Sequence, residues 1–112
     1  MAYTNVPLSG AADGRPVLVA ATADPGTTIH TAQASATNFD EIILSAGNID
    51  TVDRQLSLEI GSNTASDIVQ MTIPAGEIVQ VPAIFLRNSL PLKAFAAVAN
   101  KIILFGHVIR EA

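Results

Sequence analysis

The sequence predicts an all-β domain, a two-sheet antiparallel sandwich of the jelly-roll or immunoglobulin-like kind with an extended N-terminal arm. Three observations predict it. From Pro16 onward, short apolar runs alternate with turn signals at spacings of about 8 to 14 residues, which is typical of sandwiches and barrels. The chain is 49% hydrophobic but only 4% aromatic, so its core must consist mainly of Ile, Leu, Val and Ala. No repeat with a period of about 20 to 50 residues is present, which disfavours a solenoid or propeller.

The 112 residues fit a single domain preceded by a short arm. Residues 1–15 are small and polar and are interrupted by Gly and Pro. They contain few large side chains whose burial would offset the entropy of ordering them. We therefore expect residues 1–15 to form an extended arm that is ordered only where it lies on another surface, with a frayed terminus as the alternative. Residues 16–112 are expected to form the sandwich.

Three strands are predicted in the first half of the domain. Pro16–Ala21 is a short apolar run that Asp24-Pro25-Gly26 closes. Thr27–Thr31 is rich in β-branched residues, which favour strands. Phe39–Ala46 is the third strand and ends at the turn residues that follow it.

Arg54–Ile60 has the clearest strand pattern in the chain. Leu56, Leu58 and Ile60 alternate with polar residues, so the apolar side chains share one face of the strand. This alternation predicts a sheet whose other face is in contact with water.

The next two apolar runs are predicted to form a β-hairpin. Asp67–Ile73 and Glu77–Val81 are joined by Pro74-Ala75-Gly76. Proline presets the φ that the first turn position needs, and Gly76 can adopt the left-handed conformation of a bulged turn.

The last third of the chain contains three more extended segments. Pro82–Leu86 is expected to continue as an edge strand or a bend. Leu92–Ala99 has a helix-like apolar stripe, but Pro91 before it and a strongly β-prone successor favour a strand. Lys101–Arg110 is apolar on both faces, which predicts a central strand or one that lies beneath a partner subunit.

Histidines offer little catalytic or metal-binding chemistry. His30 and His107 are the only two, and no H-x-H or H-x₃₋₅-H pair is present, so a zinc site or a metal site of the cupin type is not expected. A histidine hydrogen-bonded within a strand is the ordinary interpretation of each. There is no G-x-S-x-G elbow, no phosphate-binding glycine motif and no HExxH sequence.

Carboxylate pairs are equally unspecific. Asp40 and Glu41 are adjacent on a strand and therefore point to opposite faces. Asp50 and Asp53 lie in a loop and could help to bind calcium, although a solvated turn is the more ordinary interpretation. We therefore expect no enzymatic activity, no cofactor and no metal.

Charge and composition limit the partners. Ten acidic and six basic residues give a formal charge of −4, and the basic residues are dispersed, so nucleic acid is not an expected partner. The apolar run Ile102–Gly106 is far shorter than the roughly 20 residues of a membrane span, and residues 1–13 lack the features of a signal peptide. The chain has no cysteine, which is compatible with a reducing cytoplasm. Charged residues make up 14% of the chain, well below the roughly 25% of ordinary soluble domains, so part of the surface is expected to be covered by a protein partner.

Several stretches resemble small virion structural proteins encoded among the head and tail genes of tailed bacteriophages. The resemblance spans about residues 17–110 and consists of short strand motifs: TTIHT at Thr27–Thr31, DEIILSAGN at Asp40–Asn48, LSLEIG at Leu56–Gly61, TIPAG at Thr72–Gly76 and GHVIR at Gly106–Arg110. Such proteins are β-sandwiches that decorate or cement the capsid, often as trimers, or that belong to the tail.

The resemblance implies a capsid decoration or cement protein, a homotrimer located in the virion and assembled in the host cytoplasm. Its partner would be the major capsid protein or another virion protein. The alternative is a tail or fibre module that binds a receptor or glycan, although the absence of Trp argues against a sugar-stacking platform. A small jelly-roll hydrolase or metal enzyme using His30 or His107 is the third possibility.

Candidate contact residues are large apolar side chains in the arm, in the later loops and on one face of the last strand. We expect the subunit or capsid interface to draw on Tyr3, Val6, Leu8, Phe85, Leu86, Leu90, Ile103, Phe105 and Ile109. Core packing is the competing interpretation for the last three.

Overall fold

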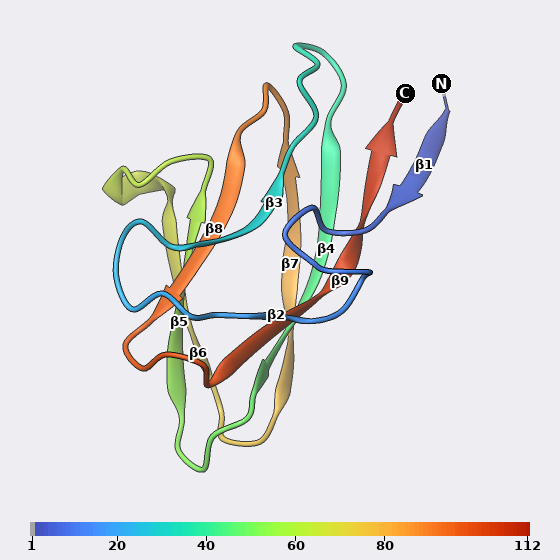
Figure 1. Ribbon diagram of the computed structural model, residues 1–112. Coiled ribbons are helices and arrows are strands. Elements are labelled where there is room, and N and C mark those ends of the chain that lie inside the picture. The colour runs from blue at the N-terminus through green and yellow to red at the C-terminus, as the bar shows by residue number, and fades with distance from the viewer. Residues whose placement is uncertain (1) are drawn as a thin grey trace.

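A computed structural model describes residues 2–112 and shows two antiparallel sheets packed face to face (Figure 1). The described residues contain nine strands and one short 3-10 helix. In chain order the elements are β1 (Tyr3–Val6), β2 (Val17–Leu18), β3 (Thr27–Thr31), β4 (Asp40–Asn48), β5 (Arg54–Ile60), η1 (Ala65–Asp67), β6 (Ile68–Ile73), β7 (Ile78–Leu86), β8 (Pro91–Ala96) and β9 (Ile102–Glu111). The prediction of an all-β two-sheet sandwich is confirmed.

The strand order identifies the sandwich as a jelly roll. One sheet has the order β1-β9-β4-β7, with β2 also paired to β9, and the other has the order β3-β8-β5-β6. From β2 to β5 the chain alternates between the sheets, and from β6 to β9 it alternates again, so that β5 and β6 form the only hairpin within one sheet. Eight strands divided in this way between two four-stranded layers make a jelly roll, to which β1 adds a further strand.

Apolar side chains of both sheets fill the space between them. The core consists almost wholly of Ile, Leu, Val and Ala, as composition predicts. Strand β9 crosses the middle of the larger sheet between β1 and β4, and its inward residues Ile102, Leu104 and Val108 are fully buried. The predicted central position of this strand is confirmed. The strand prediction for Leu92–Ala99 is confirmed over Pro91–Ala96, after which the chain turns.

The predicted hairpin between the sixth and seventh strands is wrong. The turn forms as expected, with the amide of Glu77 donating to the carbonyl of Pro74 at 3.1 Å and Gly76 at a φ of 70°. However, β6 pairs with β5 in one sheet and β7 pairs with β4 in the other. The turn therefore carries the chain across the sandwich edge instead of folding it back within one sheet.

The N-terminal segment is extended only in β1 and turns between residues 9 and 14, and the surface on which it lies is its own chain. Strand β1 pairs with β9, so the described N- and C-terminal residues lie side by side (Figure 1). Leu8 is 2% exposed and belongs to the core. The expected arm, residues 1–15, is thus anchored to the sandwich over its described part, and Met1 lies outside the described residues.

Two smaller expectations need correction. The first predicted strand shrinks to Val17–Leu18, although Val19 still packs into the core. The polar face of β5 is only partly in contact with water: Gln55 is exposed as expected, but Ser57 and Glu59 are 4% and 2% exposed. The loop that ends at Gly26 lies over the part of this face that carries Glu59, and the amide of Gly26 donates a hydrogen bond to Glu59 Oε1 at 2.7 Å.

The structure contains no helix, among the described residues, with the length and apolar character that crossing a membrane would require.

Candidate functional site: the outer face of the larger sheet

The outward side of the five-stranded sheet, here called the outer sheet face, is unusually apolar. On β9, Ile103, Phe105 and Ile109 point away from the core and are half-buried. The strand register places them opposite Gly47, Ser45 and Glu41 of β4. Further apolar side chains on this face come from the neighbouring strands and from the segment before β4, and these are Tyr3, Leu18, Phe39, Ile43, Ile78 and Phe85.

Of the nine predicted contact residues, the structure brings five together on the outer sheet face. They are Tyr3, Phe85, Ile103, Phe105 and Ile109. Tyr3 and Phe85 are 63% and 57% exposed.

The other four predicted contact residues lie elsewhere. Leu8 and Leu86 are in the core, and Val6 packs against it, so these three contribute to folding. Leu90 is 40% exposed, but it lies in the loop between β7 and β8, where its side chain covers Gly61.

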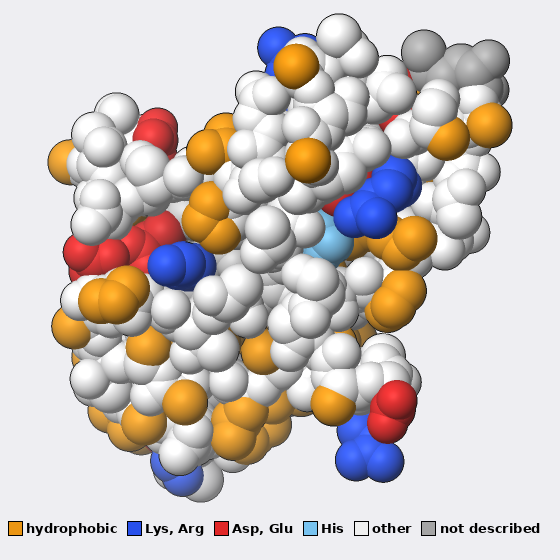
Figure 2. Space-filling view, turned by 45° about the horizontal axis from the view of Figure 1, so that its top comes forward, with side chains coloured by type: hydrophobic (Ala, Val, Ile, Leu, Met, Phe, Trp, Pro, Cys, Tyr) orange, Lys and Arg blue, Asp and Glu red, His pale blue; other side chains and the backbone are white. Residues whose placement is uncertain are grey.

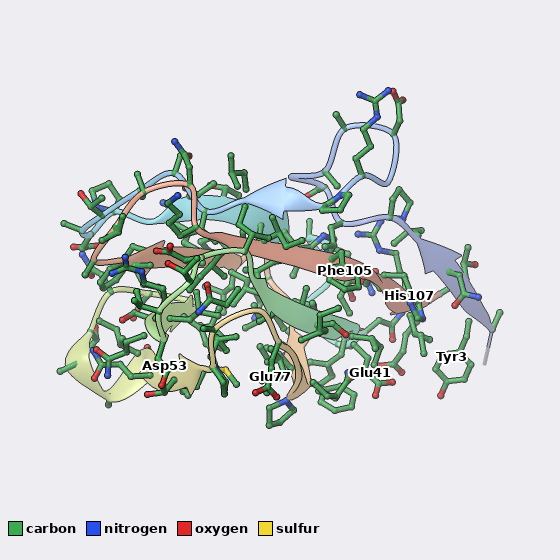
Figure 3. The ribbon with its side chains drawn as sticks, turned by 90° about the horizontal axis from the view of Figure 1, so that it is seen from below. Tyr3, Glu41, Asp53, Glu77, Phe105 and His107 are labelled. Carbon is green, nitrogen blue, oxygen red and sulfur yellow. The ribbon has the colours of Figure 1, made fainter. Side chains whose placement is uncertain are left out.

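One end of the outer sheet face is hollowed into an open cavity of about 400 Å³. Its lining comes from β1, β4, β7, β9 and the residue before β4, and consists of Tyr3, Phe39, Glu41, Phe85, Ile109 and Glu111. Tyr3 and Glu41 lie near each other at this end of the sheet, whereas Glu77 is farther along it (Figure 3).

Ring contacts and one hydrogen bond shape the cavity. Phe39 and Phe85 meet edge to face, with ring centroids 6.3 Å apart and an interplanar angle of 88°. The guanidinium of Arg87 lies 4.5 Å from the centroid of Phe39. The amide of Phe39 donates to Glu111 Oε1 at 2.8 Å, which fixes the position of that carboxylate. The rings and one acid are therefore held in place before any partner arrives.

Sequence reasoning missed Phe39, Glu41 and Glu111 as members of this site. The alternation of side chains along β4 could have indicated Glu41, because Asp40 and Glu41 were expected to point to opposite faces. The structure confirms that expectation, since Asp40 is buried and Glu41 lines the outer cavity. Glu111 follows the last predicted strand, and only the pairing of β1 with β9 brings it beside Tyr3.

His30 belongs to a buried polar network inside the sandwich. Its Nδ1 accepts a hydrogen bond from the amide of Ser9 at 3.0 Å, so Nε2 carries the proton and donates to Asp40 Oδ2 at 2.8 Å. Both imidazole nitrogens are engaged, and neither is placed to accept a proton from a nucleophile. The hydroxyl of Ser9 itself accepts from the amide of Thr31.

Asp40 is the centre of this network. Its carboxylate also accepts hydrogen bonds from Nε and Nη2 of Arg110, both at 2.9 Å, and from the amide of Gln33 at 3.1 Å. Burial raises the pKa of Asp40, but the hydrogen bonds from Arg110 and His30 outweigh burial and hold that pKa below its ordinary value. The network joins the N-terminal segment to β3, β4 and β9, which is a structural role.

A second, polar cleft of about 260 Å³ lies on the other sheet. Its lining consists of Asp24, Pro25, Glu59, Ser62, Asn63, Pro91 and Lys93. Burial raises the pKa of Glu59, and its hydrogen bond with Asp24 raises that pKa further. The same hydrogen bond, together with one from Asn63, lowers the pKa of Asp24. The two neighbouring carboxyl groups therefore have pKa values shifted in opposite directions.

The remaining sequence candidates have local roles. Asp50 is ion-paired with Arg54, and Asp53 Oδ1 accepts the amide of Ala75 at 2.9 Å. Within residues 2–112 no group of three or more His, Cys, Asp or Glu side chains is arranged to hold a metal ion. His107 is exposed on the outer sheet face, whereas His30 is buried between the two sheets.

Fold and site together define a jelly-roll protein that exposes an apolar sheet face with an aromatic, acidic cavity at one end. Comparisons of the chain with known protein families, with curated protein sequences and with solved structures gave no match.

Proposed function

We propose that this chain is a non-enzymatic structural protein of a phage virion, which decorates or cements the capsid shell through its outer sheet face. In this proposal it acts as a homotrimer, its partner is the major capsid protein or another virion protein, and it is located in the virion. The observation that carries the proposal is the outer sheet face itself.

That face holds more apolar surface than folding requires. The core is complete without it, because the inward residues of β9 and β4 are already fully buried. Ile78 is 67% exposed and packs with Ile103 across the bare backbone of Gly47. Polar residues such as Ser45, Gln80 and His107 lie on the same face, but exposed apolar side chains gathered on one face typically mark a protein-interaction surface.

Composition and architecture support the same proposal. The chain is poor in charge. On the face of the molecule that Figure 2 shows, Lys, Arg, Asp and Glu form only a few small, separate groups, with hydrophobic side chains scattered between them. Jelly rolls occur in viral capsid proteins, but also in lectins and cupins, so the architecture supports the proposal by analogy alone.

The direct test is binding to assembled shells. We expect the purified chain to co-sediment with capsid shells that lack it, and light scattering to give three times the 11.6 kDa of one chain. Phe105→Ser should weaken shell binding by about tenfold or more, because it removes a large side chain from the centre of the face.

The matched control is Val69→Ser. Val69 is 47% exposed and lies on β6 of the other sheet, so its replacement should leave shell binding unchanged. A strict monomer without affinity for shells would refute the proposal.

A second candidate function, a tail or fibre module that binds a receptor or glycan, is favoured by the polar cleft at Asp24, Asn63 and Lys93. Carboxylate, amide and ammonium groups can hydrogen-bond to sugar hydroxyls. Glycan-array binding that Asp24→Asn abolishes, combined with no affinity for shells, would favour this function over capsid decoration.

A further inference from the structure

The cavity on the outer sheet face concentrates the few aromatic residues of the chain. Three of the five aromatic side chains, Tyr3, Phe39 and Phe85, line it. Core packing does not explain this, because Tyr3 and Phe85 are more than half exposed. Aromatic rings gathered at a surface cavity provide flat, electron-rich faces for a ligand.

Two carboxylates, Glu41 and Glu111, line the same cavity. Glu111 is held by the amide of Phe39, and Glu41 forms no ion pair with any residue that the structure describes. The guanidinium of Arg87 lies over the ring of Phe39, but Arg87 is not among the residues that line the cavity. The cavity therefore combines aromatic side chains with two carboxylates, and none of its lining residues is a cation.

The complementary ligand is a flat cation. A guanidinium group can lie on an aromatic ring and at the same time donate two parallel hydrogen bonds to a carboxylate, whereas an ammonium group is compact and more strongly hydrated. The stacking of Arg87 on Phe39 shows that this surface already accommodates one guanidinium in such a way.

We propose that the cavity lined by Tyr3, Phe39 and Phe85 binds an arginine side chain of the partner protein, with its guanidinium against the exposed rings of Tyr3 and Phe85 and paired with Glu41 and Glu111. This inference rests on the proposed function only in taking the partner to be a protein. The formal charge of −4 favours the approach of a basic segment. Ile109, at the base of the cavity, would contact the aliphatic part of the arginine side chain.

The test is an NMR titration of the isotopically labelled full chain with the blocked tripeptide acetyl-Gly-Arg-Gly-amide. We expect saturable shift changes confined to the lining residues, and no binding of the matched peptide with citrulline, which has the same shape but no charge. Glu41→Gln should lower the affinity at least fivefold and Phe85→Leu at least threefold. Glu77→Gln, which removes an exposed carboxylate from a position away from the cavity, should leave the affinity unchanged (Figure 3).

Equal binding of the citrulline peptide, shift changes outside the cavity, or an unaltered affinity of Glu41→Gln would each overturn the inference. Tighter binding of tetramethylammonium than of the peptide would also overturn it, because the cavity would then be a site for small cations.

Shell binding separates this inference from the proposed function. Shells that bind Glu41→Gln and Phe85→Leu as tightly as the unchanged chain would refute the role of the cavity and leave capsid decoration intact. Arginine-peptide binding by a chain without affinity for shells would support the cavity as an arginine site and refute capsid decoration.

Discussion

Replacement of Asp40 by asparagine should destabilise the fold strongly, because this carboxylate holds four hydrogen-bond donors inside the sandwich. The donors are His30 Nε2, the amide of Gln33, and two nitrogens of Arg110. Asparagine keeps one acceptor oxygen, but it turns an NH2 group toward donors and removes the charge that compensates Arg110. Breaking a fully buried ion pair on one side costs about 3–5 kcal/mol in free energy of unfolding, and the 34% exposure of the Arg110 side chain places this loss toward the lower end. That is a large part of the roughly 5–15 kcal/mol that stabilises a small domain.

The matched control is Asp50→Asn, which removes a partly exposed ion pair with Arg54. Such a pair contributes little to stability, because water screens it. Equilibrium urea unfolding followed by circular dichroism measures both variants. A loss below about 1 kcal/mol for Asp40→Asn, or equal losses for the two variants, would contradict the assignment of Asp40 as the centre of the network.

The pH dependence of stability gives an independent readout of the same residue. The pKa of Asp40 is lowered in the folded state, so its contribution is present above the unfolded pKa of about 3.9 and is lost as the pH falls through the lower folded value. The urea midpoint of the unchanged chain should therefore fall on acidification below about pH 4, and Asp40→Asn should show a smaller fall. Identical acid profiles would contradict this reasoning.

Three further predictions concern packing, backbone and the second carboxyl pair. Leu104→Ala leaves a cavity at a fully buried site and should cost about 2–5 kcal/mol of unfolding free energy in urea. Gly106→Ala should cost at least about 3 kcal/mol or prevent soluble expression, because Gly106 has a φ of 152° and a Cβ there would lie 1.9 Å from the carbonyl oxygen of Ile43; near-normal stability would contradict the strain. The raised pKa of Glu59 means that its contribution is present below the unfolded pKa of about 4.3 and is lost as the pH rises through the folded value. Glu59→Gln should abolish the fall of the urea midpoint that Glu59 causes as the pH rises, and an unchanged profile would argue against a raised pKa of Glu59.

Local patterns predicted the strands well because strand formation depends on the alternation of neighbouring side chains. The strand Arg54–Ile60 has the predicted bounds, and β9 is central as its two apolar faces indicated. The face of β5 that carries Glu59 was nevertheless expected to be in water. The loop that covers it lies 33 positions away in the sequence, so no pattern within the strand reveals it.

Sheet membership was less predictable than strand position. The turn residues Pro74-Ala75-Gly76 specify a reversal of chain direction, and the structure has that reversal. They do not specify whether the next strand pairs with the previous one or crosses to the opposite sheet. That choice depends on the strands with which β6 and β7 pair, because β6 pairs with β5 in one sheet and β7 pairs with β4 in the other. A good turn sequence therefore predicts a turn and leaves its hydrogen-bonding partners undetermined.

The candidate site was half predictable for a related reason. Ile103, Phe105 and Ile109 follow from the apolar alternation of one strand, whereas the cavity needs the register of four strands at once. Glu111 and Tyr3 meet because β1 pairs with β9, and Glu41 and Phe85 meet because β4 pairs with β7. These pairings join residues that are 108 and 44 positions apart in the sequence (111 − 3 and 85 − 41), and no local pattern encodes them.

The two apolar faces of β9 have different physical explanations. A strand apolar on both sides is expected at the centre of a sheet that is covered on both faces. Here the inner face is covered by the second sheet, and Ile102, Leu104 and Val108 are fully buried. The outer face of the same strand is only half-buried among the described residues, although it belongs to the same central strand. Central position therefore explains one of its two faces, and the other supplies the exposed apolar surface on which the proposed contact rests.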